Sequence, residues 1–199
     1  MTASGTLDRR AVVRELLTDR GDLLVVAGLG ASAWDITAAG DCATNLPLWG
    51  GMGGAAMIGL GVALAQPSRR VLVITGDGEM LMGIGSLATI AITRPANLSV
   101  VVLDNEHYSE TGGQETATRH GVDLAAIAKG AGIADSRTLH AMQEIGPLRQ
   151  AIHAAEAPLF AVVKVAAGNQ PLVLPPREGA FLTARFREAV LGPAAHHQL

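Results

Sequence analysis

Two side chains that could bind a metal ion follow two apolar segments of the sequence. Asp77 lies in Gly76-Asp77-Gly78 directly after residues 71–75, and Asn105 lies 28 residues further on, after residues 98–103. A helix, a strand and short turns fill that spacing, so both side chains return to one edge of a sheet. One carboxylate and one neutral oxygen suit a Mg²⁺ ion that also holds phosphate groups. Because the glycines let backbone amides approach phosphate oxygens, the sequence predicts a magnesium-bridged diphosphate site.

Each half of this pattern also has a plain structural interpretation. Gly-Asp-Gly is a common turn, and an asparagine that ends a strand is equally ordinary. The combination favours the diphosphate site, because the turn follows an apolar strand and is itself followed by a helix, a second strand and Asp104-Asn105.

Alternating helices and strands must position these groups. Apolar runs predict strands over residues 23–27, 71–75, 98–103 and 159–165. Helices are predicted over residues 7–20, 53–65, 81–93, 124–131, 141–154 and 180–190, and a loop over residues 106–121. This alternation predicts an α/β fold, a mainly parallel sheet with helices on both faces.

Three glycine-rich or polar stretches fall where the carboxyl ends of the strands should lie, at residues 28–32, 76–79 and 105–114. Ligands bind at that edge in open parallel sheets. No linker divides the chain, so we expect a single domain over residues 1–199, with an N-terminal helix over 1–20 and a peripheral C-terminal segment over 171–199.

The composition excludes several classes of protein. A net charge of −3 without a basic block argues against nucleic acid as a partner. No apolar run reaches the ~18 residues of a membrane span, and the charged start lacks a signal-peptide core. The single cysteine, Cys42, fits a reducing cytoplasm. Hydrophobic residues make up 49% and charged residues 17%, which predicts a surface partly covered by other subunits.

Several motifs together resemble one enzyme family. Gly76-Asp77-Gly78-Glu79 followed by Asn105 resembles the diphosphate-and-metal motif of thiamine-diphosphate enzymes, and residues 48–55 (LWGGMGGA) resemble the segment that cradles the cofactor's aminopyrimidine. Residues 86–90 (SLATI) and 111–116 (TGGQET) narrow the resemblance to the cofactor-binding part of sulfopyruvate decarboxylase and phosphonopyruvate decarboxylase. It covers about residues 22–135, and separated motifs in the correct order are more specific than one alone.

The resemblance implies a role for each matching residue. Asp77, the Asn105 side chain and the backbone carbonyl of His107 are expected to bind Mg²⁺. The Gly50 carbonyl is expected to accept a hydrogen bond from the cofactor, and Met52 to bend the cofactor into its reactive shape. The remaining residues expected to contact thiamine diphosphate are Gly30, Ser32, Gly76, Gly78, Glu79 and Tyr108.

Some of these residues also fit simpler roles, and two depart from the family. Met52 could be a core methionine that fills a gap, and Ser32 could cap a helix. Glu79 stands where the decarboxylases often have a small residue, so its side chain is expected to point away from the phosphates. Glu106 replaces a common Asn or Gly, which would alter the polarity of the pocket.

The resemblance also implies a partner. In this superfamily a glutamate on a separate domain activates the cofactor, and that domain normally precedes the segment seen here. We expect a second polypeptide to carry the pyrimidine-binding domain with this glutamate, in an assembly with two or more copies of each chain.

The expected reaction is decarboxylation of a 2-oxo acid to an aldehyde and CO₂, with the cofactor as electron sink. A 3-sulfo- or 3-phosphono-pyruvate substrate would need cationic donors, which Arg119 and His120 could supply unless they are a solvated loop pair. The full set of candidate substrate contacts is His107, Tyr108, Glu110, Thr111, Gln114, Arg119 and His120.

Three alternatives remain open on the sequence. The chain could belong to a split carboligating enzyme that resembles acetolactate synthase or transketolase, although residues 111–114 favour the decarboxylases. It could be a non-catalytic subunit that binds thiamine diphosphate. A dinucleotide-binding module fits least, because Gly28-Leu29-Gly30 lacks the third glycine of that fingerprint.

Overall fold

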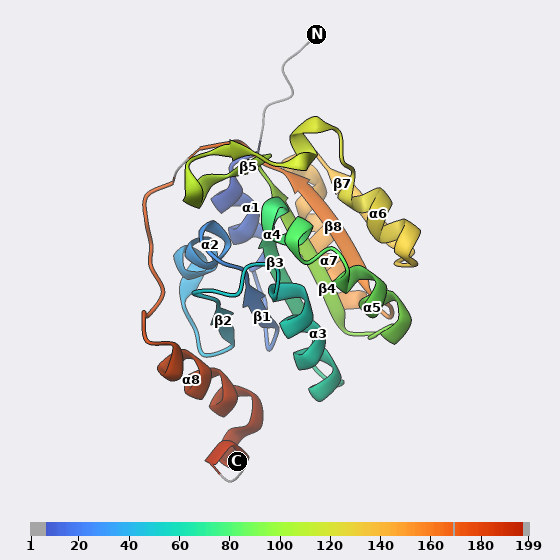
Figure 1. Ribbon diagram of the computed structural model, residues 1–199. Helices are drawn as coiled ribbons and strands as arrows, with labels where there is room; N and C mark the ends of the chain where they lie inside the picture. The colour runs from blue at the N-terminus through green and yellow to red at the C-terminus, as the bar shows by residue number, and fades with distance from the viewer. Residues whose placement is uncertain (1–6, 169, 197–199) are drawn as a thin grey trace.

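The computed structural model describes residues 7–168 and 170–196, and a six-stranded parallel sheet forms its centre (Figure 1). The strands lie in the order β2-β1-β3-β4-β8-β7. They are β1 (Leu24–Ala27), β2 (Asn45–Pro47), β3 (Val71–Gly76), β4 (Leu98–Asp104), β7 (Asp135–Leu139) and β8 (Leu159–Lys164). A small antiparallel pair, β5 (His107–Tyr108) and β6 (Gln114–Glu115), lies outside this sheet. The predicted fold class is confirmed.

Helices cover both faces of the sheet, because alternate residues of each strand point to opposite sides. Val25 and Ala27 pack with α1, α2 and α7, whereas Leu24 and Val26 pack with the helices of the other face. The helices are α1 (Arg9–Leu16), α2 (Ala31–Gly40), α3 (Ala55–Ala65), α4 (Asp77–Met82), α5 (Ser86–Thr93), α6 (Leu124–Ala131), α7 (Ile145–Ala154) and α8 (Gly179–Leu191).

The chain changes direction across the sheet between β1 and β3. From β1 it passes through α2 to β2 on one side, and from β2 it returns through α3 to β3 on the other side of β1. The connections at the carboxyl ends of β1 and β3 therefore lead to opposite faces, which opens a crevice between them. The fold places the residues after Ala27 and after Gly76 on the two sides of that crevice.

The predicted helix over residues 81–93 is wrong as a single element. It is divided into α4 and α5 by a turn around Gly83, and α4 begins at Asp77 directly after β3, where a turn was expected. Gly83 lies against the backbone of Gly53: a Cβ on Gly83 would be 2.2 Å from the Gly53 carbonyl oxygen. This close approach requires a residue without a Cβ at position 83, where α4 ends.

Three elements were not predicted. Helix α2 consists largely of small residues without a strong apolar face, and β2 has three residues that include a proline. Strand β7 has the sequence DSRTL at the edge of the sheet and is mostly half-buried, so it lacks the apolar run of a central strand. The loop predicted over residues 106–121 contains the β5–β6 pair and two short 3₁₀ turns.

The two terminal segments differ in extent from their predictions. Helix α1 covers eight residues of the predicted 7–20; Asp8 caps it by accepting from the Ala11 amide at 2.7 Å. Residues 170–178 cross the molecule to α8, whose Leu182 and Phe186 are buried against the domain. Residues 1–6 and 197–199 of the predicted terminal segments, with His197, lie outside the described residues.

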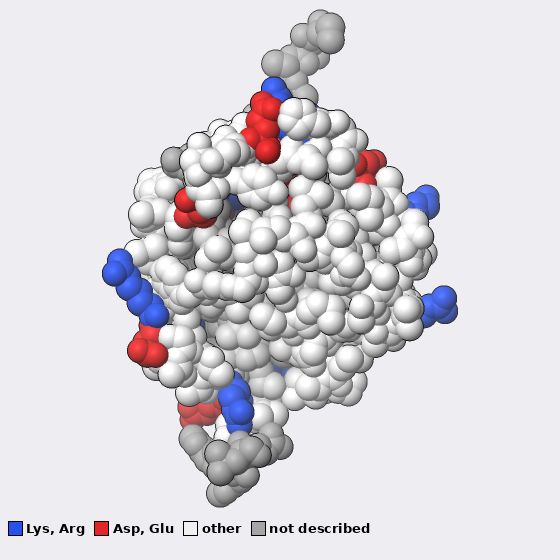
Figure 2. All heavy atoms as spheres, in the orientation of Figure 1, with Lys and Arg blue, Asp and Glu red and all other residues white. Residues whose placement is uncertain are grey.

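Apolar side chains are exposed on the face that carries α3, α4 and α5. Figure 2 shows that few charged side chains interrupt the centre of this face. Its large exposed apolar residues, here called the apolar face, are Met57, Ile58, Leu64, Met82 and Ile92. In the described part of the chain, no helix combines the length and the apolar character that crossing a membrane requires.

Candidate cofactor-binding site

A cavity of about 640 Å³, partly open to solvent, lies at the crevice between β1 and β3. The loops after β1, β3 and β4 all contribute to its wall, as the three predicted stretches required. The predicted site residues that line it are Ser32, Met52, Gly76, Asp77, Gly78, Glu79, Asn105, His107, Tyr108 and Thr111, together with the substrate candidate Glu110.

Five predicted residues do not line this cavity. Gly30 lies beneath the side chain of Glu110, which lines the cavity, whereas Gly50 is exposed. Gln114 bonds to Thr111 in the exposed turn. Arg119 and His120 lie on the surface and pair with acidic neighbours, at 3.1 Å from Glu106 and Glu115 respectively. In this chain the two cations expected to meet an acidic substrate are therefore already paired, outside the cavity.

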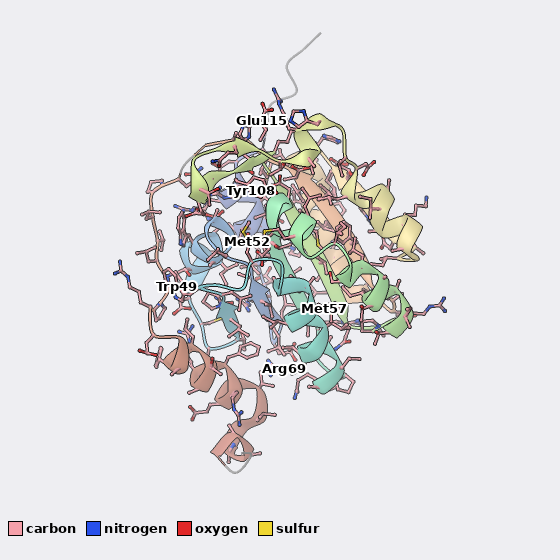
Figure 3. The ribbon with its side chains drawn as sticks, viewed as in Figure 1. Trp49, Met52, Met57, Arg69, Tyr108 and Glu115 are labelled. Carbon is pink, nitrogen blue, oxygen red and sulfur yellow. The ribbon has the colours of Figure 1, made fainter. Side chains whose placement is uncertain are left out.

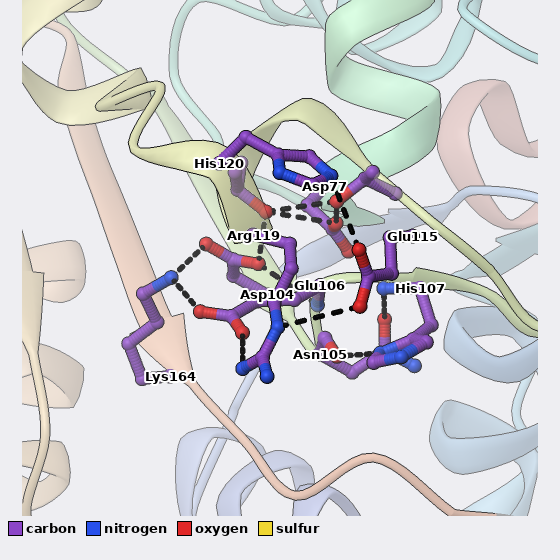
Figure 4. Close-up of polar contacts among 11 residues, drawn as sticks. Asp77, Asp104, Asn105, Glu106, His107, Glu115, Arg119, His120 and Lys164 are labelled. Carbon is purple, nitrogen blue, oxygen red and sulfur yellow. Dashed lines mark hydrogen bonds and ion pairs between the residues drawn. The ribbon is translucent and has the colours of Figure 1, made fainter.

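Asp77 is buried at the floor of the cavity and is oriented by two threonines (Figure 4). The hydroxyls of Thr116 and Thr118 both donate to its Oδ2, the latter at 3.2 Å. Burial raises the pKa of Asp77 to about 6; the hydrogen bonds lower it, and the nearby charge of Asp104 adds to the rise. Both threonines donate to the same oxygen, so they do not occupy the other oxygen of the carboxylate.

Asp104 is a second buried carboxylate beside Asp77. It receives a hydrogen bond from Thr118 at 2.8 Å and an ion pair from Lys164 of β8 at 2.7 Å. Lys164 also contacts Glu106 at 2.9 Å. This network was not predicted, because Lys164 is 60 residues from Asp104 in the sequence and adjacent to it only through the pairing of β4 with β8.

Glu106 has a left-handed backbone, with φ of 64°, a conformation that glycine and asparagine adopt more readily than glutamate. Its carboxylate is held by Lys164 and by Arg119, and these hydrogen bonds lower the pKa of Glu106. The side chain therefore lies toward the sheet edge and β8, away from the wall of the cavity.

We expect Lys164→Met to destabilise the fold by about 3 kcal/mol, because it leaves the buried carboxylate of Asp104 without its cation. Arg119→Met is the matched control: Arg119 pairs with Glu106 at the surface, so its loss should change stability little. Urea unfolding of both variants measures the difference. Equal losses in the two variants would contradict a special role for Lys164.

Asn105 is held in place by its neighbours. Its Oδ1 accepts from the His107 amide at 3.1 Å, and its amide group donates to the Ser109 hydroxyl at 3.0 Å. The ring nitrogen Nδ1 of His107 bonds to the Asn105 carbonyl at 2.8 Å, which turns the imidazole back onto the loop. Asn105 therefore presents an oriented amide oxygen to the cavity that Asp77 also lines.

Glu79 connects three segments beneath the cavity. Its Oε2 accepts from Thr75 at 2.9 Å and lies where a Cβ on Gly28 would stand, 1.8 Å away. Burial raises the pKa of Glu79, whereas Thr75 and the amides of residues 55, 53 and 29 lower it. The other carboxylate oxygen, Oε1, is buried and has no hydrogen-bond partner in the described part of the chain. The carboxylate thus lies against the end of β1, where it couples the loop after β1 to the loop that carries Met52.

Met52 and Tyr108 lie close together at the upper end of the sheet in Figure 3. The ring of Tyr108 covers Gly78, since a Cβ on Gly78 would be 2.3 Å from the ring. Trp49, in the same loop as Met52, donates from its indole nitrogen to the carbonyl of Pro176 at 2.8 Å. The C-terminal segment therefore restrains the loop that brings Met52 to the cavity.

Sequence reasoning missed part of the wall. Leu29, Ala31, Leu103 and Ser109 flank predicted residues, so they could have been found by extending the motifs. Arg9 could not, because it lies on α1, far from every motif in the sequence. Among residues 7–168 and 170–196, no three His, Cys, Asp or Glu side chains gather as a metal cage. A metal ion here would therefore need ligands of other kinds.

Comparison with known proteins matches residues 28–165 to the family described as "Thiamine pyrophosphate enzyme, C-terminal TPP binding domain". The chain is 34% identical to the sulfopyruvate decarboxylase subunit beta of Methanothermobacter thermautotrophicus, over 94% of this chain and 97% of that protein. It is 36% identical to the phosphonopyruvate decarboxylase of Streptomyces viridochromogenes, also over 94% of this chain. It spans 47%, about half, of that second relative.

Solved structures show the same fold. The benzoylformate decarboxylase of Polynucleobacter necessarius superposes with a TM-score of 0.67 at 20% identity. The superposition covers 83% of this chain and 34% of that protein. At this identity the likeness concerns the arrangement of strands and helices.

Proposed function

The chain belongs to the thiamine pyrophosphate enzymes through their C-terminal cofactor-binding domain, and from this we propose that it is the cofactor-binding part of a thiamine-diphosphate-dependent 2-oxo acid decarboxylase. The observation that carries the proposal is the cavity between β1 and β3, which gathers Asp77, Asn105 and Met52 from three separate motifs. The named relatives at about 35% identity are decarboxylases of this class.

The residues of the cavity fit a metal ion shared with a diphosphate. Asp77 supplies one anionic oxygen and Asn105 one neutral oxygen, and we assign the His107 carbonyl as a third ligand. Mg²⁺ is commonly bound in proteins by one or two carboxylates together with phosphate oxygens, which agrees with the lack of an all-protein cage among the described residues. The buried carboxylates of Asp77 and Asp104 interact unfavourably, and Lys164 pairs with Asp104 and not with Asp77, so a divalent cation would offset the remaining repulsion.

Other residues shape the cavity and orient its contents. Gly30 and Ser32 lie at the start of α2, and Gly78 and Glu79 lie in the first turn of α4. We assign these four residues to the binding of the diphosphate. Met52 reaches the cavity from the opposite side, on a loop restrained by Trp49. When bound, thiamine diphosphate supplies the electron sink for loss of CO₂ from a 2-oxo acid. A 3-sulfo- or 3-phosphono-pyruvate-like substrate follows from the names of the relatives.

We assign the activating glutamate to a second polypeptide. The relative from Methanothermobacter thermautotrophicus, matched over nearly its whole length, is named as one subunit of its enzyme. The apolar face adds a physical reason, since exposed apolar patches of this kind mark protein contacts. The partner that fits is the chain with the pyrimidine-binding domain.

Reconstitution tests the proposed function. The chain is purified from its native lysate together with any bound polypeptide, and CO₂ release is measured from 3-sulfopyruvate, 3-phosphonopyruvate and pyruvate, with and without thiamine diphosphate and Mg²⁺. We expect CO₂ and a free aldehyde, both dependent on the cofactor. A condensed acyloin product would place the chain among the carboligating enzymes, and failure of the chain and its complex to bind the cofactor would refute the proposal.

We expect Ile92→Asp to prevent this assembly, because Ile92 is 85% exposed on the apolar face and a carboxylate there would be desolvated on contact. Met142→Asp is the matched control: Met142 is also exposed, but it lies before α7 on the other side of the sheet. Sedimentation velocity of the co-purified complex measures the outcome. Assembly that survives Ile92→Asp would place the interface elsewhere.

A further inference from the structure

Arg9 is a positively charged residue in the wall of the cavity, and no sequence motif predicts it there. It lies on α1, outside the matched segment 28–165, and its side chain is 7% exposed. The cations expected from the sequence, Arg119 and His120, lie outside this cavity. Arg9 is therefore a buried cation of the cavity wall, and it comes from a different part of the chain.

A fully buried carboxylate fixes Arg9. Asp35 of α2 contacts Nε of Arg9 and also accepts from Nε of Arg10 at 3.1 Å. Two guanidinium groups share one carboxylate, so one positive charge at this corner is left without a formal counter-ion. Because the contact uses Nε of Arg9, its terminal nitrogens remain to serve an anion in the cavity.

The charge of Arg9 acts on the carboxylate of Glu110, which also lines the cavity. A Cβ on Gly30 would lie 2.9 to 3.1 Å from Glu110, so this side chain covers Gly30, whose φ of +76° suits a residue without a Cβ. Burial raises the pKa of Glu110 and the charge of Arg9 lowers it. Within residues 7–168 and 170–196, no side-chain hydrogen bond or ion pair holds the Glu110 carboxylate.

We propose that Arg9 binds a tetrahedral oxyanion of the ligand in this cavity. In the ligand-free protein the Glu110 carboxylate takes the place of this oxyanion, which displaces it on binding. The planar guanidinium, fixed by Asp35, suits the paired oxygens of such a group. The start of α2, where Gly30 and Ser32 lie, is the adjoining wall, which favours the diphosphate over the acidic tail of the substrate. This inference rests on the proposed function, since it adds a residue to the same site.

Calorimetry on the chain in its co-purified complex tests the proposal, with Mg²⁺ and either thiamine diphosphate or unphosphorylated thiamine. We expect Arg9→Gln to weaken thiamine diphosphate about 10- to 100-fold, as for the loss of a hydrogen bond to a charged group, and to leave thiamine unchanged. Glu110→Gln should strengthen thiamine diphosphate, because it removes the competing charge. Arg10→Gln is the matched control: it shares Asp35 but lies outside the cavity wall, and it should change affinity less than about 3-fold.

Each outcome decides between stated alternatives. Arg9→Gln could leave the affinity for the cofactor unchanged and raise the KM of the reconstituted enzyme for 3-sulfopyruvate but not for pyruvate. That result would support Arg9 as the residue that binds the oxyanion, with the substrate as its ligand. Unchanged affinity and unchanged KM would overturn the proposal while the proposed function stood. Equal losses in Arg9→Gln and Arg10→Gln with a lowered Tm would reduce Arg9 to a structural role. Absence of binding in the wild-type complex, to thiamine diphosphate and inorganic pyrophosphate alike, would refute both.

Discussion

Asp77→Asn is expected to weaken the binding of thiamine diphosphate with Mg²⁺ by at least about 100-fold. Changes to groups that only orient a metal ligand already cost about 10- to 100-fold, and this change neutralises the assigned ligand itself. Asn105 and the His107 carbonyl cannot replace the charge, because both are neutral oxygens. Calorimetry with varied Mg²⁺ measures the loss, which should appear mainly as a loss of metal dependence.

The same substitution should leave the ligand-free protein as stable as the wild type, or more stable. Burial raises the pKa of Asp77 to about 6, so at neutral pH the fold carries an ionised group in an unfavourable place, and asparagine removes that charge. Affinity and Tm should thus move independently or in opposite directions. Asp135→Asn, at an exposed pair with Arg137, is the control. A large drop in Tm for Asp77→Asn would mean that lost folding, and not a lost ligand, explains weak binding.

Gly83→Ala is expected to destabilise the fold by about 1 to 3 kcal/mol, the usual cost of inserting a methyl group into a well-packed contact. The new Cβ would lie 2.2 Å from the carbonyl oxygen of Gly53, and a backbone atom cannot turn aside as a side chain can. Since Gly53 is next to Met52, the same clash should displace the loop at the cavity and weaken cofactor binding. A thermal melt and a cofactor titration together measure both effects.

Gly85→Ala is the matched control for this prediction, two residues along the chain. Its Cβ would meet nothing within 4 Å, and its φ of −61° is one that alanine readily adopts. We expect stability within about 1 kcal/mol of the wild type, with a gain where alanine restricts the unfolded chain. If both substitutions proved equally harmless, the contact between Gly83 and Gly53 would not be tight in solution.

Sequence reasoning located the centre of the cavity because a simple geometric rule governs it. Parallel strands bring their carboxyl ends to one edge, so Asp77 and Asn105 had to meet once each was placed after a strand. The same rule applied to the stretch 28–32, which follows β1. Local spacing along the chain was sufficient for these groups.

Other features depend on contacts that local spacing does not encode. Arg9 reaches the cavity through an ion pair with Asp35, 26 residues away, and Lys164 reaches Asp104 through strand pairing. The end of α4 at Gly83 lies against the backbone of Gly53, and the polar edge strand β7 forms because β8 lies beside it. Arg119 and His120 seemed free in the sequence, and only the fold shows the acidic partners that hold them.

The hydrogen bond from Trp49 to Pro176 joins two segments that are synthesised at different times during translation. Domains form from the N-terminal side as the chain emerges, and a contact across 127 residues must wait for its later partner. The strands that flank the crevice can pair before Pro176 exists, but the loop of Met52 then still lacks one restraint. The loop of Met52 therefore gains this restraint only after the strands around the crevice are able to pair.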